Sequence, residues 1–333
     1  MSSLPVIWGA LIAFAVFAYV VLDGFDLGIG ILYPLLKPGE QRDRAMNSVA
    51  PLWDGNETWL VFGGGGLMAA FPLAYAVILP ALYAPIIAML LALIFRGVAF
   101  EFRWRDPAHR PAWDLSFTLG SVVAALAQGI TLGALLQGIT VEGRAYAGGW
   151  WDWLTPFSLL TGVSLVAGYA LLGATWLIMK TEGALRERVR ALARRAAWLT
   201  LGALVLVSLA TPLLSLEYMH RWFDWPRVLY TAQVPLAVTV VALLLWLALR
   251  RGADWQPFVL TIILFALGMA GLGVSMFPEI VPGSLTLHEA AAPPESLIFM
   301  LVGAVILLPI ILTYSGYAYW VFRGKVGTDG YHR

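Results

Sequence analysis

The stretch PLWDGNETWLVFGGGGLMAAF, residues 51–71, is the most informative part of the chain for its fold. It begins with two carboxylates, Asp54 and Glu57, and continues as an apolar segment rich in glycine. An ionisable side chain beside lipid is costly, so acids at the head of an apolar segment need a purpose. The stretch therefore predicts a membrane-spanning helix with a functional polar end.

Composition extends this prediction to the whole chain. The 333 residues are 60% hydrophobic and only 12% charged, which is far more apolar than a soluble domain requires. Segments of about 20 apolar residues match a hydrocarbon core of about 30 Å. We predict an all-α polytopic membrane protein with a single integral-membrane domain, 1–333. The absence of cysteine excludes disulfides, thiolate metal sites and cysteine nucleophiles.

The apolar runs predict nine transmembrane helices with alternating loops. Of the 21 basic residues, three fall in the loops of one side (Arg144, Arg221 and Arg227), one lies inside a span (Arg96), and the other 17 fall on the opposite side. Lys and Arg favour cytoplasmic loops, so we expect the N-terminus outside and the C-terminus in the cytoplasm. The predicted spans are 6–36, 52–72, 75–104, 113–139, 156–180, 193–215, 228–250, 257–278 and 297–322.

The outer loops are rich in tryptophan, as in WWDWLTPF (150–157) and RWFDWPRVLY (221–230). Indole rings prefer the headgroup layer, which makes interfacial anchoring the simpler interpretation. Binding of a lipid-like ligand is the alternative.

Charged residues of the first three spans are expected to meet at one depth. With a rise of about 1.5 Å per residue, all of them fall near the cytoplasmic side. An ionisable group inside a span is a functional hypothesis with a partner to be named, and we expect Asp26 or Asp54 to pair with Arg96. The predicted group comprises Asp23, Asp26, Asp54, Glu57, Glu101 and Arg96.

Each of these features also has a purely structural interpretation. Asp54 and Glu57 have the spacing of a capping box, which would satisfy the helix end without further role. The Arg96 side chain could extend to the inner headgroups. The four glycines 63–66 allow close approach of another helix or of a bulky flat group.

Histidine placement bears on cofactors. The four histidines, His109, His220, His288 and His332, fall in loops or in the tail, whereas a haem inside the membrane needs a ligand within a span. We therefore predict that this chain alone binds no haem, metal or other cofactor and has no catalytic residue of its own. No Walker A, nucleophile-elbow or HExxH motif is present.

Five motifs give the chain a family resemblance. They are DGFDLGIGIL (23–32), NSVAPLWDGNETWL (47–60), FRGVAFEFR (95–103), GVSMFPEIVP (273–282) and LPIILTYSGYAYW (308–320). With these motifs the chain resembles subunit II of cytochrome bd quinol oxidase, including the cyanide-insensitive type, over essentially its whole length.

The resemblance implies a heterodimer in a bacterial or archaeal cytoplasmic membrane. Subunit I would carry two haem b and one haem d, oxidise quinol on the outer face and reduce dioxygen to water, and subunit II would carry no haem. A small single-span accessory subunit can join, and a quinone or lipid bound in subunit II is left open. No nucleic-acid partner is expected. The implied fold is two four-helix bundles, 1–140 and 150–280, with a peripheral ninth helix, 297–322.

The resemblance also implies roles for particular residues. Trp53 and Arg96 match positions at the interface with the haem-bearing region of subunit I, where Arg96 would compensate haem charge. A proton path from the cytoplasm would use Asp54, Glu57, Asp23 and Asp26. Glu57 departs from other members, which carry an uncharged residue there, so it either joins the path or only caps the helix.

Two other functions remain open from the sequence. In the first, the chain is a scaffold that covers subunit I, and its charged residues are structural ion pairs. In the second, it is a stand-alone secondary transporter whose glycine-rich helix builds a site at the membrane midplane.

Overall fold

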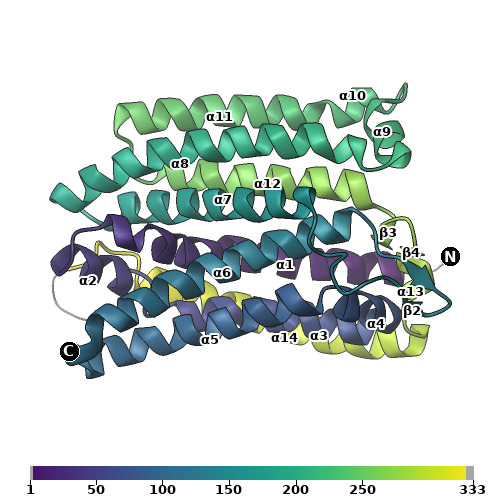
Figure 1. Ribbon diagram of the computed structural model, residues 1–333, viewed down its shortest axis with the longest axis horizontal. Helices are drawn as coiled ribbons and strands as arrows, with labels where there is room; N and C mark the ends of the chain where they lie inside the picture. The colour runs from purple at the N-terminus through teal and green to yellow at the C-terminus, as the bar shows by residue number, and fades with distance from the viewer. Residues whose placement is uncertain (1–2, 328–333) are drawn as a thin grey trace.

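The fold, seen in a computed structural model that describes residues 3–327, is an array of long helices that run side by side (Figure 1). Short helices and two small hairpins lie at the ends of the array. The long helices are α1 (Leu4–Leu32), α3 (Trp53–Ala70), α5 (Tyr83–Arg105), α6 (Arg110–Leu136), α7 (Pro156–Lys180), α8 (Gly183–Ala210), α11 (Gln233–Arg251), α12 (Gln256–Met276) and α14 (Pro294–Val321).

Eight helices of the described chain are long and apolar enough to cross a membrane. This confirms the prediction of a helical, polytopic membrane protein in its general form. The helix α3 is not among the eight because its first turns carry Asp54, Asn56 and Glu57. With 18 residues it is nevertheless about 27 Å long, and it packs along α1.

The predicted start of the third span, at residue 75, is wrong. A separate helix, α4 (Pro72–Ala81), lies between α3 and α5, and the backbone leaves the helical conformation at Phe71 and at Leu82. Pro72 follows the first break as the first residue of α4, a position that suits proline because its missing N–H would have no partner within the helix there. The α3–α4–α5 connection is therefore a bent segment, and α5 begins only at Tyr83.

The short elements separate to opposite ends of the array (Figure 1). One end holds η1 (Tyr33–Leu35), α2 (Glu40–Asn47) and η2 (Pro107–His109). The other holds two antiparallel hairpins, which an all-α prediction did not include, together with the remaining short helices. These are β1 (Val141–Glu142), β2 (Ala145–Tyr146), β3 (Glu279–Val281), β4 (Leu285–Thr286), η3 (Thr211–Leu213), α9 (Leu216–Phe223), α10 (Val228–Thr231) and α13 (Leu287–Ala290).

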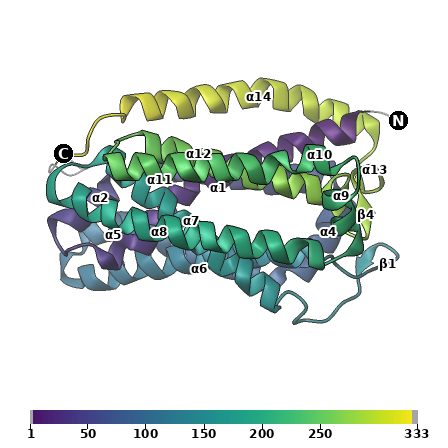
Figure 2. The same cartoon turned by 90° about the horizontal axis from the view of Figure 1, so that it is seen from above.

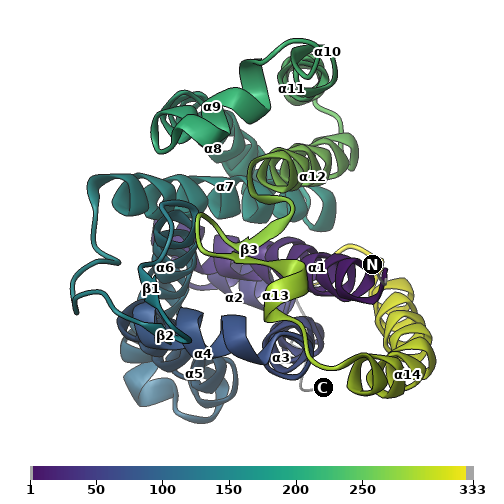
Figure 3. The same cartoon turned by 90° about the vertical axis from the view of Figure 1, so that its right-hand side faces the viewer.

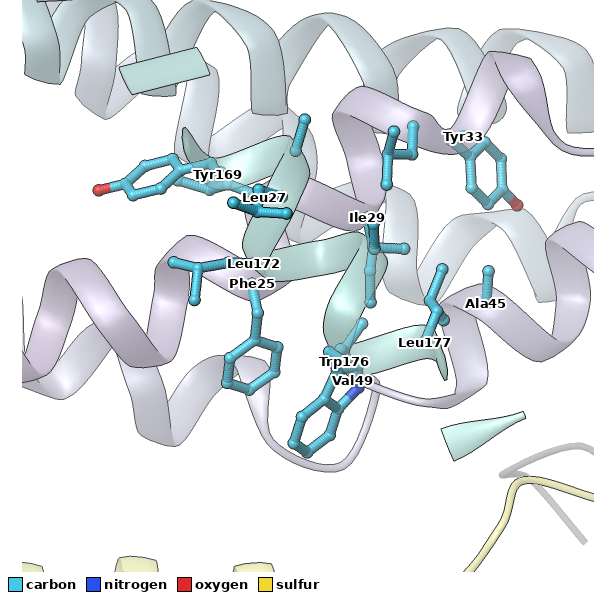
Figure 4. Packing of buried hydrophobic residues seen from close by; sticks show 14 of the residues in the cluster. Phe25, Leu27, Ile29, Tyr33, Ala45, Val49, Tyr169, Leu172, Trp176 and Leu177 are labelled. Carbon is cyan, nitrogen blue, oxygen red and sulfur yellow. The ribbon is translucent and has the colours of Figure 1, made fainter. Parts of the chain in front are cut away.

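The seam between α1 and α7 brings two helix backbones into direct contact. A Cβ atom on Gly28 would lie 1.8 Å from the carbonyl oxygen of Tyr169, and one on Gly173 would lie 2.4 Å from the carbonyl carbon of Gly28. Glycine is required because the two backbones touch. Nearby, the Phe25 ring stacks on Trp176 with centroids 4.2 Å apart (Figure 4). Such packing, rather than hydrophobicity, holds helices together in lipid.

The last helix, α14, lies at the edge of the array and is fastened at its ends (Figure 2). Only Leu297 and Ala304 are buried along it. At its start, the indole nitrogen of Trp8 donates to the Leu297 carbonyl at 3.0 Å. Beyond its end, the Lys180 ammonium donates to the carbonyls of Phe322 and Gly324.

Candidate functional site

A charged cluster lies inside the array where α1, α3 and α5 meet. Asp23 and Asp26 come from α1, Glu57 from the second turn of α3, and Arg96 from the middle of α5. The side chains of Asp23, Asp26 and Arg96 are fully buried, whereas Glu57 is 26% exposed. The depth argument from the sequence thus brought together four of the six residues that it named.

Arg96 is the centre of the cluster. Its Nη1 lies 2.6 Å from Asp23 Oδ1 and 3.6 Å from Glu57 Oε1, and its Nη2 lies 3.9 Å from Asp26 Oδ2. One cation is therefore shared by three carboxylates, with Asp23 closest. Arg96 is completely buried, so its side chain does not extend to the headgroups. Its guanidinium pairs with acids of the same chain instead.

Asp54 is not a partner of Arg96. It lies exposed in the first turn of α3 and makes no ion pair with any residue of 3–327. Its position, one helical turn before Glu57, is too close to the helix end to reach the guanidinium. The predicted capping box is also wrong, because Leu52 is the N-cap of α3 and no side chain caps the helix. Trp53, the neighbour of Asp54, stacks on Phe100 with centroids 5.2 Å apart.

Two polar residues that the sequence reasoning missed complete the cluster. The amide of Asn56 donates to Asp26 Oδ2 at 2.8 Å and accepts from the Tyr319 hydroxyl at 2.8 Å. Tyr319 comes from α14, so the last helix of the chain takes part in the site. Both residues lie within motifs quoted above, yet nothing in their spacing indicates that they meet.

A chain of uncharged polar groups continues from the cluster into α6 and α7. Tyr19 lies one turn before Asp23 on α1, and its hydroxyl accepts from Gln128 Nε2 at 2.8 Å. The Tyr169 hydroxyl in turn donates to Gln128 Oε1 at 2.7 Å. The sequence reasoning considered only charged groups and therefore did not include these three residues.

A second ionic network lies at the end of the array that holds α2. Arg103 is buried and contacts Asp43 at 2.8 Å and Asp114 at 2.6 Å, and Asp114 also pairs with Arg42 at 2.9 Å. The sequence reasoning counted Arg42 and Arg103 only as loop charges. Glu101, which was expected in the main cluster, lies outside it, because it is 47% exposed and pairs with Arg105 at 3.2 Å.

The family model for cytochrome bd terminal oxidase subunit II matches residues 4–322. The chain belongs to the cytochrome bd terminal oxidase subunit II family. It is therefore a subunit of a terminal oxidase, an oxidoreductase complex. The resemblance found in the five sequence motifs is confirmed.

Curated bacterial relatives agree with the family over nearly the whole chain. Subunit 2 of the cytochrome bd-I ubiquinol oxidase of Escherichia coli strain K12 is 32% identical over an alignment 366 positions long, gaps included. The alignment covers 98% of this chain and 96% of the relative. Subunit 2 of the cytochrome bd ubiquinol oxidase of Bacillus subtilis strain 168 is 30% identical over 341 residues, 98% of each chain. A chain of the bd oxidase structure from Geobacillus thermodenitrificans shares the fold, with a TM-score of 0.77 and 19% identity over 96% of this chain and 99% of that one.

The bd oxidase family implies haem in the complex, and the residues of this chain do not fit a haem within its long helices. His109 lies in η2, His220 in α9 and His288 in α13, all at the ends of the array, and His332 lies outside the described residues. Within residues 3–327, no cluster of three or more His, Asp or Glu side chains is arranged to hold a metal ion. No reaction step is therefore assigned to a haem held by this chain.

Proposed function

We propose that this chain is the haem-free subunit of a bd-type quinol oxidase and that it serves the haem-bearing subunit in two ways. It supplies a proton path from the cytoplasm and it stabilises the interface. Quinol oxidation and dioxygen reduction take place in the partner, which is the subunit expected to carry two haem b and one haem d. The observation that carries the proposal is the buried charged cluster on α1, α3 and α5.

The proton path follows the exposure of the acids. Asp54 is exposed, Glu57 is partly exposed, and Asp23 and Asp26 are buried, so the four form a sequence from the helix end inward. Asp23 Oδ2 and Asp26 Oδ1 accept no hydrogen bond from a described residue and can accept one from water. Intramembrane carboxylates of this kind are typical of proton relays. We assign Asp54 to the entrance, Glu57 to the next position and Arg96 to charge balance.

The interface follows the outer face of α3. Asp54, Glu57, Val61, Gly64, Gly65 and Met68 form one stripe at helical spacing, and Val61 is 73% exposed. A Cβ on Gly64 or Gly65 would meet nothing within 4 Å. A partly exposed carboxylate next to a small-residue stripe suits a protein partner better than lipid. We propose that the haem-bearing subunit covers this stripe. Because Arg96 is buried within this chain, any effect of its charge on the haems acts across the interface without direct contact.

The orientation follows the charge distribution. We place the chain in a bacterial cytoplasmic membrane, with the N-terminus outside and the C-terminus in the cytoplasm. In this arrangement α3 also crosses the membrane and brings the number of crossings to nine. The helices α1, α3, α5 and α6 form the first bundle, α7, α8, α11 and α12 the second, and α14 is peripheral. Two features support this assignment. Loops predicted on opposite sides lie at opposite ends of the array (Figure 1), and α14 stands apart from the other helices in the end view (Figure 3).

The test is Asp54→Asn in the assembled complex, with Glu101→Gln as the matched control. Both remove an exposed carboxylate at the same end of the array, but Asp54 lies one helical turn before Glu57, whereas Glu101 pairs with Arg105. We expect Asp54→Asn to lower quinol-driven oxygen consumption and proton uptake by about tenfold, and Glu101→Gln to leave both unchanged. Unchanged proton uptake in Asp54→Asn would show that the path assignment is wrong.

A purely structural role is the second candidate, because Arg96 and its acids form a closed ion-pair cluster. In that case Asp26→Asn lowers the amount of assembled complex, while each assembled molecule turns over normally. In a proton path, the assembled molecules themselves are slower. Turnover per haem, measured beside the yield of complex, separates the two roles.

A further inference from the structure

The first turns of α8 carry five arginines, and two of them have neither an acidic partner nor a backbone acceptor among the described residues. Arg186 and Arg190 pair with Asp254, and Arg194 donates to the Leu249 carbonyl at 3.3 Å. The other two are Arg188 and Arg195, which form no ion pair with any residue of the described chain. Arg188 has one weak contact, its Nη1 lying 3.5 Å from Gln41 Oε1.

These two arginines line a surface pocket of about 290 Å³. Ala191 and Leu192 lie between them on α8, and Leu35 of η1 forms the opposite wall. No carboxylate lines the pocket, so its charge is entirely positive. Arg188 and Arg195 are two helical turns apart, about 10.5 Å along the axis, and lie on the same face.

The surroundings of the pocket are apolar and face outward. Leu35 is 52% exposed, and Trp198, one turn beyond Arg195 on the same face, is 67% exposed. An exposed indole next to arginines is typical of the headgroup layer of a membrane. The pocket lies at the end of the array that holds α2, the end to which the basic loops belong (Figure 1).

We propose that this pocket binds the phosphate of an anionic phospholipid from the cytoplasmic leaflet. The planar guanidinium groups of Arg188 and Arg195 suit phosphate oxygens, which they bind in a bidentate manner. Leu35, Ala191 and Trp198 provide an apolar wall for the glycerol and the upper acyl chains. Basic pockets between helices on the cytoplasmic side are a known mode of lipid headgroup binding.

A lipid fits this place better than a protein partner. The helix α8 lies on the far side of the array from α3 and α5, with α1 and α7 between them (Figure 3). The stripe assigned to the haem-bearing subunit is therefore remote from the pocket. The site stands on its own geometry and does not depend on the proposed proton path.

The test measures lipid binding to the purified oxidase complex by native mass spectrometry. Delipidated complex is titrated with dioleoyl phosphatidylglycerol, with dioleoyl phosphatidylcholine and with inorganic phosphate. The variant is Arg188→Gln/Arg195→Gln. The matched control is Arg250→Gln/Arg251→Gln, which removes the same charge from the neighbouring end of α11, where neither residue lines the pocket.

We expect phosphatidylglycerol to bind tightly to the unmodified complex and about tenfold more weakly to the pocket variant than to the control variant. Phosphatidylcholine and inorganic phosphate should bind weakly to all three proteins. Equal losses in the two variants would overturn the proposal, since they would indicate general electrostatic attraction. Tight competition by inorganic phosphate would also overturn it, because the site would then recognise a free anion.

Discussion

Two glycine-rich stretches of this chain resemble each other in sequence and differ in use. In GFDLGIGI (24–31), Gly28 of α1 is covered by the backbone of α7, which leaves no space for a methyl group. In FGGGGL, Gly63 and Gly66 face α1, but Gly64 and Gly65 face open space. The first stretch closes a seam within the chain, whereas the second leaves a surface for a neighbour.

The difference shows which helix faces are packed within the chain and which are left for a partner. At the α1–α7 seam the two helices pack against each other within the chain. The acids that pair with Arg96 lie beside this seam on α1. The outer stripe of α3 combines small residues with the partly exposed Glu57 and so presents features that lipid does not match. Substitutions at Arg96, Gly28, Gly64 and Glu289 test this contrast, and their expected effects decrease in that order.

Removing the charge at the centre should have the largest effect. Arg96→Leu leaves Asp23 and Asp26 buried without a counter-charge, which costs about 3–5 kcal/mol for a broken buried pair. We expect little folded complex, measured as the yield after purification and as thermal unfolding of what is recovered. Arg251→Leu, which removes an exposed arginine at the end of α11, is the control. A normal yield of Arg96→Leu would mean that the buried acids need no cation.

The second-largest effect is expected from a substitution that adds a methyl group to the α1–α7 seam. Gly28→Ala places a methyl group on the α7 backbone and should cost about 3 kcal/mol, since the helices must move apart. Gly64→Ala, made in the same kind of sequence, should be neutral. Thermal unfolding of the two variants compares the seam with the open stripe directly. Equal stability would remove the distinction between them.

Filling the open stripe should affect the partner rather than the fold. Gly64→Leu should leave the unfolding temperature unchanged but weaken association with the haem-bearing subunit by about tenfold. The measurement is the fraction of haem-bearing subunit retained during purification in detergent. Gly202→Leu, at another open glycine on α8, is the control, and retention equal to that control would place the interface elsewhere.

The smallest effect concerns the short helix α13, at the opposite end of the array from α2 (Figure 1). Hydrogen bonds from the backbone N–H and the hydroxyl of Thr286 hold the pKa of the Glu289 carboxyl below its ordinary value. A lowered folded-state pKa stabilises the protein above the unfolded pKa, and the contribution is lost as the pH falls through the folded pKa. Glu289→Gln should lower the unfolding temperature by about 1–2 °C at pH 7.

The same difference should vanish at a pH below the lowered folded-state pKa of Glu289, where the carboxyl is protonated in both states. Thermal unfolding of Glu289→Gln and the unmodified chain at both pH values measures it. A difference that does not change with pH would show that the carboxylate charge contributes nothing. The glycine contrast should not change with pH, which separates packing from charge.

The sequence was sufficient to predict the helical membrane fold and the meeting of four charged residues from the first three predicted spans. Apolar length and the distribution of basic residues act along one axis, and the fixed rise of a helix converts position into depth. For this reason Asp23, Asp26, Glu57 and Arg96 were expected to meet, and they do.

Rotation and neighbours could not be predicted in the same way. Which acid faces Arg96 depends on how each helix turns about its axis. Asp26 or Asp54 was expected as the partner, whereas Asp23 is the closest acid, Asp26 lies at 3.9 Å and Asp54 is not a partner. Tyr319 joins the cluster from a helix 263 residues away from Asn56, and only tertiary packing brings the two together. The bend at Phe71 depends on backbone geometry, although Pro72 indicated where it would lie.

The fastening of α14 has a consequence for how the molecule is made. The hydrogen bonds of Trp8 and Lys180 join residues 289, 142 and 144 positions apart, so they close some of the longest loops in the chain. Synthesis proceeds from the N-terminus, so Trp8 and Lys180 are made long before their acceptors on α14 and just after it. Neither hydrogen bond can form until α14 has been synthesised, so α1 and α7 must wait for this helix before the edge of the array is closed.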